Sequence, residues 1–291
     1  MKVRIVSPAK AIEGTLIDNA VSFLTKNGFD ATVSENAKGQ RNYFSGEDGT
    51  RLTDIQHAID DFEVDVILCA RGGYGCVRIV DRIDFSSLKR KQKLICGFSD
   101  ITVFHSHIHS SLGLPTVHCT VPLNFGENSK EALDSLLNVL HRNSNEYSIA
   151  ENALNRNGEA NAVIVGGNLS ILTSLIGTKS DLQTDGKILF IEDIGEPVYK
   201  IDRMMQTLKR SGKLSQLAAL IVGGMTDVTD SAIPFGKSVQ EVIAESVGAY
   251  KYPLCFDFPA GHISDNRALV LGKKAQISIG TKVLFRQAEA E

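Results

Sequence analysis

The sequence predicts an α/β fold, with a parallel sheet in its first half and a β-rich region near its end. Short apolar runs with strand character alternate with amphipathic runs of helical period as far as residue 112. This alternation is typical of a parallel sheet covered by helices on both faces. A segment rich in Asn and charge, residues 143–161, then indicates a linker. We therefore expect two domains, residues 1–150 and residues 160–291.

Elements in the first half are predicted from buried β-branched runs and from runs whose apolar residues recur three and four positions apart. The expected strands are Val3–Val6, Ala31–Val33, Val64–Cys69, Lys93–Cys96 and Thr116–His118. The expected helices are Glu13–Lys26, Leu52–Phe62, Val77–Ile83 and Ile101–Leu112.

The second half follows the same two periods, and Gly177 marks the end of one helix. Strands are expected at Ala162–Val165, Lys187–Ile191, Ala218–Val222, Leu254–Phe256, Ala268–Leu271, Ala275–Ile279 and Val283–Phe285. Helices are expected at about residues 169–176, at Ile201–Arg210 and at Val239–Val247.

Composition excludes several classes of function. The chain has 291 residues and a formal net charge of -3, so no basic field exists to hold a nucleic acid. No apolar run approaches the length of a membrane-spanning helix, and no membrane partner is expected. The five cysteines are scattered without a C-x-x-C pair, which favours neither a disulfide framework nor a thiolate metal site. A reducing cytoplasm fits this usage best.

Ser99 lies where an apolar strand run ends at Gly97 and a helical run begins at Asp100. A serine on such a strand-to-helix turn is exposed beside free helix N–H groups, which suits a nucleophile. The alternative is an ordinary N-cap serine followed by an acidic first turn. The turn lacks the second glycine of a G-x-S-x-G elbow, because Ile101 stands in that position.

A nucleophilic serine needs a base, and the base needs an orienting acid. His262 lies in a polar, glycine-bearing loop between strands, where catalytic bases are often found, although a turn histidine without a role is the alternative. Glu192 follows an apolar strand directly, and a buried carboxylate there requires a partner such as an imidazole N–H. The other interpretation of this segment is a helix-capping acid, a role open to Asp193 or Glu196.

The other histidines and the glycine-rich loop give weaker functional predictions. His105 and His109 are four apart on one helix and could bind a metal, but with no third ligand we expect His105, His107 and His109 to face solvent. His118 ends a strand and could line the same cleft as Ser99. The loop Arg71-Gly72-Gly73-Tyr74-Gly75 fits neither G-x-G-x-x-G nor a P-loop, so a nucleotide cofactor is not expected.

Five segments together resemble the LD-carboxypeptidase family, which comprises serine peptidases of murein tetrapeptide recycling and their microcin-immunity relatives. They occur in the family's order and span about residues 65 to 270. These segments are Ala70-Arg71-Gly72-Gly73-Tyr74-Gly75, Gly97-Phe98-Ser99-Asp100-Ile101-Thr102, Gly166-Gly167-Asn168-Leu169-Ser170 with Gly177-Thr178, Leu189-Phe190-Ile191-Glu192-Asp193 through Tyr199-Lys200-Ile201-Asp202-Arg203-Met204, and Gly261-His262 with Asn266.

The resemblance implies a Rossmann-like N-terminal domain, a β-rich C-terminal domain, a site between them and a homodimer. It implies Ser99 as nucleophile, His262 as general base and Glu192 as orienting acid, with Glu196 as the rival acid. We expect cleavage of an L,D-peptide bond in a murein-derived peptide, with release of a terminal D-amino acid. This chemistry requires neither a metal nor a cofactor.

The serine-peptidase chemistry that the resemblance implies requires residues in further roles. The backbone N–H of Asp100 and one from Gly72 or Gly73 are expected to hold the tetrahedral oxyanion. Arg71 is the first candidate to bind the substrate's terminal carboxylate and Arg203 the second, since arginine makes bidentate carboxylate contacts; a structural salt bridge is the alternative for Arg71. Tyr74, in the same loop, is assigned to substrate binding.

Two alternatives remain open at this point. One is a microcin-immunity-like hydrolase of a peptidyl-nucleotide, although the absence of tryptophan removes a preferred stacking residue. The other is a non-catalytic peptide-binding protein on the same scaffold. The chain also departs from the family after His118, where Cys119-Thr120 precede Val121-Pro122 in place of a glycine-proline pair. That departure concerns the cleft wall more than the chemistry.

Overall fold

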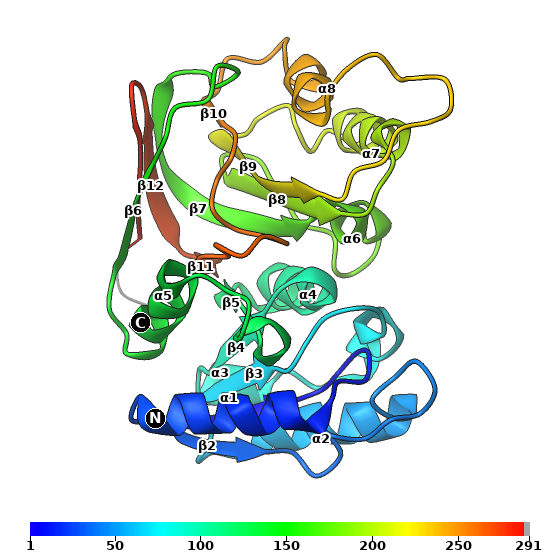
Figure 1. The fold of residues 1–291 in the computed structure, drawn as a ribbon, viewed down its shortest axis with the longest axis vertical. Coiled ribbons are helices and arrows are strands. Elements are labelled where there is room, and N and C mark those ends of the chain that lie inside the picture. Colours follow the sequence, from blue (N-terminus) through cyan, green and yellow to red (C-terminus); the bar gives the residue numbers. More distant parts are fainter. Residues whose placement is uncertain (288–291) are drawn as a thin grey trace.

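The computed structural model describes residues 1–287 and contains two sheets that lie one above the other (Figure 1). The first has the strand order β11-β5-β4-β3-β1-β2, and the second has the order β10-β9-β8-β7-β12-β13-β6. The predicted α/β class with a parallel N-terminal sheet is confirmed. Residues 288–291, which end the second expected domain, lie outside the described residues.

Strands β1 to β5 of the first sheet run parallel to one another. They are β1 Lys2–Val6, β2 Asp30–Val33, β3 Val66–Cys69, β4 Leu94–Gly97 and β5 Thr116–His118. The helices are α1 Gly14–Lys26, α2 Asp48–Asp60, α3 Ser87–Arg90, α4 Thr102–Leu112 and α5 Lys130–Leu140, with 3-10 turns η1 Cys76–Arg78, η2 Val80–Arg82, η3 Ser99–Ile101 and η4 Pro122–Asn124. Helices α1 and α5 pack on one face and α2 and α4 on the other, which buries the central strands β3, β4 and β5 on both faces.

The second sheet is mixed. Its strands are β6 Asn145–Ile149, β7 Gly158–Asn168, β8 Ile188–Ile194, β9 Ala219–Thr226, β10 Leu254–Cys255, β12 Lys274–Ile279 and β13 Val283–Gln287. Strands β7 to β10 are parallel, whereas β12, β13 and β6 continue antiparallel from β7. Helices α6 Leu169–Ser174, α7 Val198–Arg210 and α8 Val239–Ser246 pack on one face, and an aromatic cluster around Phe190, Phe258 and Phe285 fills the other.

Two features bring the halves of the chain together. Helix α4 contacts β5 on one side and β7 on the other, so it lies between the sheets (Figure 1). Strand β11 (Leu269–Leu271), from the C-terminal half, pairs antiparallel with β5 and becomes the edge of the first sheet. The carboxyl ends of β4 and β8 therefore face a shared region, where parallel sheets commonly bind ligands.

Two expectations about elements were wrong. Residues 143–161 were expected to form a linker, but they contain β6 and the start of β7, whose polar residues alternate with buried ones such as Tyr147. The helix expected over Val77–Ile83 is two 3-10 turns, η1 and η2, which are separated by Ile79. Within residues 1–287, no helix is long and apolar enough to cross a bilayer.

Candidate active site

Ser99 lies at the turn between β4 and α4, in the first position of η3, with a φ of 63°. A positive φ is uncommon for a residue with a side chain and is typical of functional turns. Gly72, after β3, lies against it: a Cβ at this glycine would approach the Ser99 Cβ to 2.7 Å. The serine is thus held in a sterically restricted turn that only a glycine neighbour permits.

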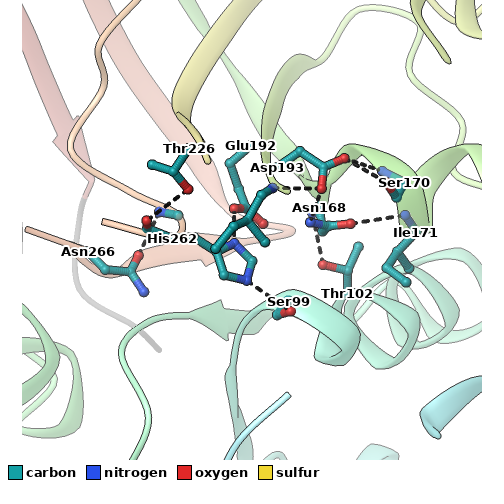
Figure 2. A network of polar contacts seen from close by, with 12 residues as sticks. Ser99, Thr102, Asn168, Ser170, Ile171, Glu192, Asp193, Thr226, His262 and Asn266 are labelled. Atoms are coloured by element: carbon teal, nitrogen blue, oxygen red, sulfur yellow. Dashed lines mark hydrogen bonds and ion pairs between the residues drawn. The ribbon is translucent and has the colours of Figure 1, made fainter. Parts of the chain in front are cut away.

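His262 and Glu192 complete a chain of contacts with Ser99, as Figure 2 shows. The imidazole Nε2 is 3.1 Å from the Ser99 Oγ, and Nδ1 is 2.6 Å from the Glu192 Oε2. Glu192 is fully buried near the end of β8, whereas the His262 side chain remains 14% exposed. The structure therefore brings together three side chains that are far apart in the sequence, and Glu192, rather than Glu196, contacts the imidazole.

Burial and the carboxylate act on His262 in opposite directions. Burial alone would lower the pKa of His262, but the hydrogen bond and negative charge of Glu192 outweigh it, so the net shift of the pKa is upward. A carboxylate at Nδ1 also places the ring proton on that nitrogen, which leaves Nε2 free to accept the serine proton. The arrangement can therefore perform nucleophilic chemistry with a general base.

Two family models match most of the chain. The LD-carboxypeptidase N-terminal domain matches residues 3–119, and the LD-carboxypeptidase C-terminal domain matches residues 161–277. The chain belongs to the LD-carboxypeptidase family. It is therefore a peptidase, and so a hydrolase, and the resemblance drawn from the five motifs is confirmed.

Individual relatives agree with this family. A probable murein peptide carboxypeptidase of Bacillus subtilis is 33% identical over 98% of this chain and 91% of its own length. The crystal structure of muramoyltetrapeptide carboxypeptidase from Oxalobacter formigenes has a TM-score of 0.91 at 24% identity, covering 99% of each chain. MccF in complex with glutamyl sulfamoyl guanosine has a TM-score of 0.88 at 20% identity, covering 100% of this chain and 96% of its own. The structural likenesses establish a shared fold.

Three backbone N–H groups in the serine turn and the glycine loop are candidates for an oxyanion hole. Within residues 1–287, the amides of Gly72, Gly73 and Asp100 donate no hydrogen bond. Backbone N–H groups that lack an acceptor and lie beside a nucleophile can form an oxyanion hole. The Asp100 side chain is buried and accepts from the Cys76 N–H at 2.9 Å, which ties the glycine loop to the serine turn.

Arg71 extends from the same loop and is half-buried. Its Nη1 donates to the Ala11 carbonyl at 3.0 Å, and no carboxylate of residues 1–287 lies within ion-pair distance. Within those residues, Arg71 therefore forms no structural salt bridge. Tyr74 is 46% exposed beside the Phe44 ring, and Arg203 lies over the Tyr199 ring on α7.

A second polar network lies next to Glu192 and contains Asp193 and Glu196, the two acids for which a helix-capping role was left open. Asp193 accepts from the Asn168 Nδ2 at 3.0 Å and from the Ser170 N–H at 2.9 Å (Figure 2). Glu196 meets Ser170 at 3.3 Å and Lys200 at 3.3 Å. The glycine-asparagine motif before α6 and the paired acids after β8 were the signals for this network, but their proximity depends on the pairing of β7 with β8.

The histidines of α4 do not face solvent as expected. His105 is 2% exposed and its Nε2 contacts the Gly97 carbonyl at 2.9 Å, while His107 contacts the Ser180 hydroxyl at 2.9 Å. The reason is that other elements pack on both sides of α4. The spacing of apolar residues along the helix could not reveal this packing. No group of three or more metal-ligating side chains occurs in the part of the chain that the structure describes.

A pocket of about 220 Å³ opens beside the imidazole. Its apolar wall includes Phe98, whose ring centroid is 4.8 Å from that of His262. The lining residues are Phe98, Asn124, Glu127, Asn128, Ile194, His262, Ile263 and Ser264. Open space therefore exists next to the imidazole of His262.

Proposed function

We propose that this protein is a serine carboxypeptidase that hydrolyses an L,D-peptide bond and releases a terminal D-amino acid from a murein-derived tetrapeptide in the cytoplasm. The observation that carries the proposal is the continuous contact from the Ser99 Oγ through His262 to the buried Glu192. A serine, a base and an orienting acid in contact are the groups that activate a hydroxyl at neutral pH.

The proposed mechanism has two halves. His262 takes the proton of Ser99 as the oxygen attacks the carbonyl, and amides of Asp100 and Gly72 or Gly73 stabilise the oxyanion. His262 then gives that proton to the departing amine, which breaks the peptide bond and leaves an acyl-serine. Water, deprotonated by His262, attacks the ester, and Ser99 recovers its proton as the shortened peptide leaves.

Substrate preference is argued from charge. A carboxypeptidase must neutralise the terminal carboxylate of its substrate, and Arg71, in the loop that contains Gly72 and Gly73, has no carboxylate partner among residues 1–287. The names of the Bacillus and Oxalobacter relatives point to murein peptides. The charge of Arg71 and the names of these relatives together favour an anionic, murein-derived peptide as the substrate.

The deciding experiment is D-alanine release from an L,D-linked tetrapeptide by purified protein, beside a D,D-linked peptide and an acyl-nucleotide. We expect turnover of the L,D-peptide alone and its loss in Ser99→Ala. Ser106→Ala is the matched control, because Ser106 is a buried serine on α4 and the hydroxyl that contacts His262 is that of Ser99. Unchanged turnover in Ser99→Ala would remove the serine from the mechanism, and binding of the peptide without turnover would favour a non-catalytic protein.

A further inference from the structure

We infer that His118 and Asn266 are positioning residues that hold the loop carrying His262 in register with Glu192 and Ser99, a role that rests on the proposed function. Neither side chain hydrogen-bonds to Ser99 or to the imidazole of His262. Both are enclosed in the protein, at 0% and 1% exposure. Buried polar side chains of this kind are retained at a cost unless their hydrogen bonds serve the structure.

The carbonyl oxygen of Asn266 accepts two hydrogen bonds. One comes from the Gly261 N–H at 2.8 Å, and the other involves the His118 Nε2 at 3.1 Å. Because the backbone amide can only donate, the Asn266 atom that faces it is Oδ1. The His118 Nε2 must therefore carry a proton and donate to the same oxygen.

The surroundings of His118 support that protonation state. Burial lowers the pKa of His118 to about 4, so the ring is neutral near pH 7. Its Nδ1 has no hydrogen-bond partner within residues 1–287, and Phe98 and Phe190 meet the ring with centroids 5.8 and 4.9 Å away. A neutral imidazole packed against two aromatic rings donates from Nε2 in a fixed direction. His118 therefore holds the Asn266 oxygen rigidly in place.

The Gly261 N–H that Asn266 accepts belongs to the residue immediately before His262, the general base. Gly261 has a φ of 110°, and a Cβ there would lie 2.7 Å from the Glu192 Cβ, so the loop rests directly on the acid. On the other side, the Thr226 hydroxyl donates to the His262 carbonyl at 3.1 Å. Anchoring the Gly261 amide thus fixes the distance between the imidazole and Glu192, and an error of about 1 Å at such a site can cost on the order of 100-fold in rate.

The test compares His118→Phe with His118→Gln. Phenylalanine keeps the aromatic packing but removes the donor, whereas the glutamine amide can place an N–H where Nε2 was. For His118→Phe we expect a kcat for the L,D-peptide roughly 10- to 100-fold lower with KM nearly unchanged. We also expect an NMR-determined pKa of His262 below the wild-type value, because the bond to Glu192 that raises it loosens. His118→Gln should restore most of both.

The charged groups near His262 are Glu192, Asp193 and Asp227, and neither variant alters them. Tyr147→Phe is the matched control, since it removes another buried hydrogen bond of the same segment, from the phenol to the Ala268 carbonyl at 2.6 Å. It should lower the melting temperature without moving kcat or the His262 pKa. If His118→Phe does not fold, Asn266→Ala replaces it in the same comparison.

The inference is overturned if His118→Phe loses stability but keeps the wild-type kcat and His262 pKa, or if His118→Gln behaves like His118→Phe. Failure of the wild type to release D-alanine would instead count against the proposed function. The positioning role would then be read from the His262 titration and from the rate at which a fluorophosphonate labels Ser99.

Discussion

At the scale of single residues, the site depends on a few unfavourable conformations that the fold enforces. Ser99 has a φ of 63°, a conformation that costs a residue with a Cβ on the order of 1 kcal/mol. Gly72 lies so close to it that any side chain would displace the hydroxyl. Such strain persists only where surrounding contacts determine the backbone, here the link from Asp100 to the Cys76 amide.

Substitution of Gly72 tests this closeness. Gly72→Ala should lower kcat by roughly 100-fold or more, because the new methyl group displaces Ser99 and one candidate oxyanion donor. Steady-state kinetics on the L,D-peptide measure the effect. Gly49→Ala in α2 is the control, since a Cβ there meets no atom within 4 Å. Equal activity of the two variants would contradict the proposed geometry.

The choice between the two glutamates is a second prediction at this scale. Glu192→Gln should lower kcat by orders of magnitude, because the amide cannot stabilise an imidazolium, whereas Glu196→Gln should have a far smaller effect. Comparison of kcat for the two variants, with circular dichroism to verify folding, decides the matter. An inactive Glu196 variant beside an active Glu192 variant would reassign the acid.

At the scale of elements, the site is assembled from the ends of strands in different sheets. Strand β4 leads into Ser99, β8 carries Glu192 near its end, and the loop before β11 carries His262. The N-terminus of α4 is tied to the end of β7, because the Thr102 hydroxyl accepts from the Asn168 N–H at 3.0 Å (Figure 2). This bond fixes the helix that follows the nucleophile against the second sheet.

Thr102→Val should lower the free energy of unfolding by about 1–3 kcal/mol, because the shape is kept while the buried Asn168 amide loses its acceptor. Urea denaturation measures the loss. Thr102→Ser retains the hydroxyl and should lie between the valine variant and wild type. A valine variant as stable as the serine variant would show that the link contributes nothing.

At the scale of the whole molecule, the two halves of the chain share one structure. Strand β11 lies at the edge of the first sheet, and the Gln287 side chain bonds both the N–H and the carbonyl of Val270 at 2.8 Å. Between the sheets lie two neutral histidines, His105 and His118, whose pKa values burial lowers to about 3 and about 4. Both are therefore protonated more readily in the unfolded chain.

This difference predicts acid sensitivity. Stability from these histidines should be complete above about pH 6.5, the ordinary pKa, and should fall as the pH drops toward 4, by several kcal/mol at about 1.4 kcal/mol per pKa unit. His262, whose pKa is raised, acts oppositely and stabilises less as the pH rises through that pKa. Melting temperatures between pH 4 and 8 measure the trend, and His118→Gln should flatten it. A wild-type melting temperature that is constant across this range would contradict the prediction.

The sequence by itself determined the α/β class, the order of most elements and the motifs around Ser99, Glu192 and His262, because period, strand-end polarity and turn glycines are local properties. It did not reveal that residues 143–161 contain a strand, since the polar alternation of β6 becomes a burial pattern only beside β13. Nor could it show that His105 is buried, which follows from the second sheet covering α4. The contacts among Ser99, His262 and Glu192, and the support of His262 through His118 and Asn266, were decided by tertiary structure alone. They join residues 70 to 163 positions apart, and only the packing of the two sheets sets those distances.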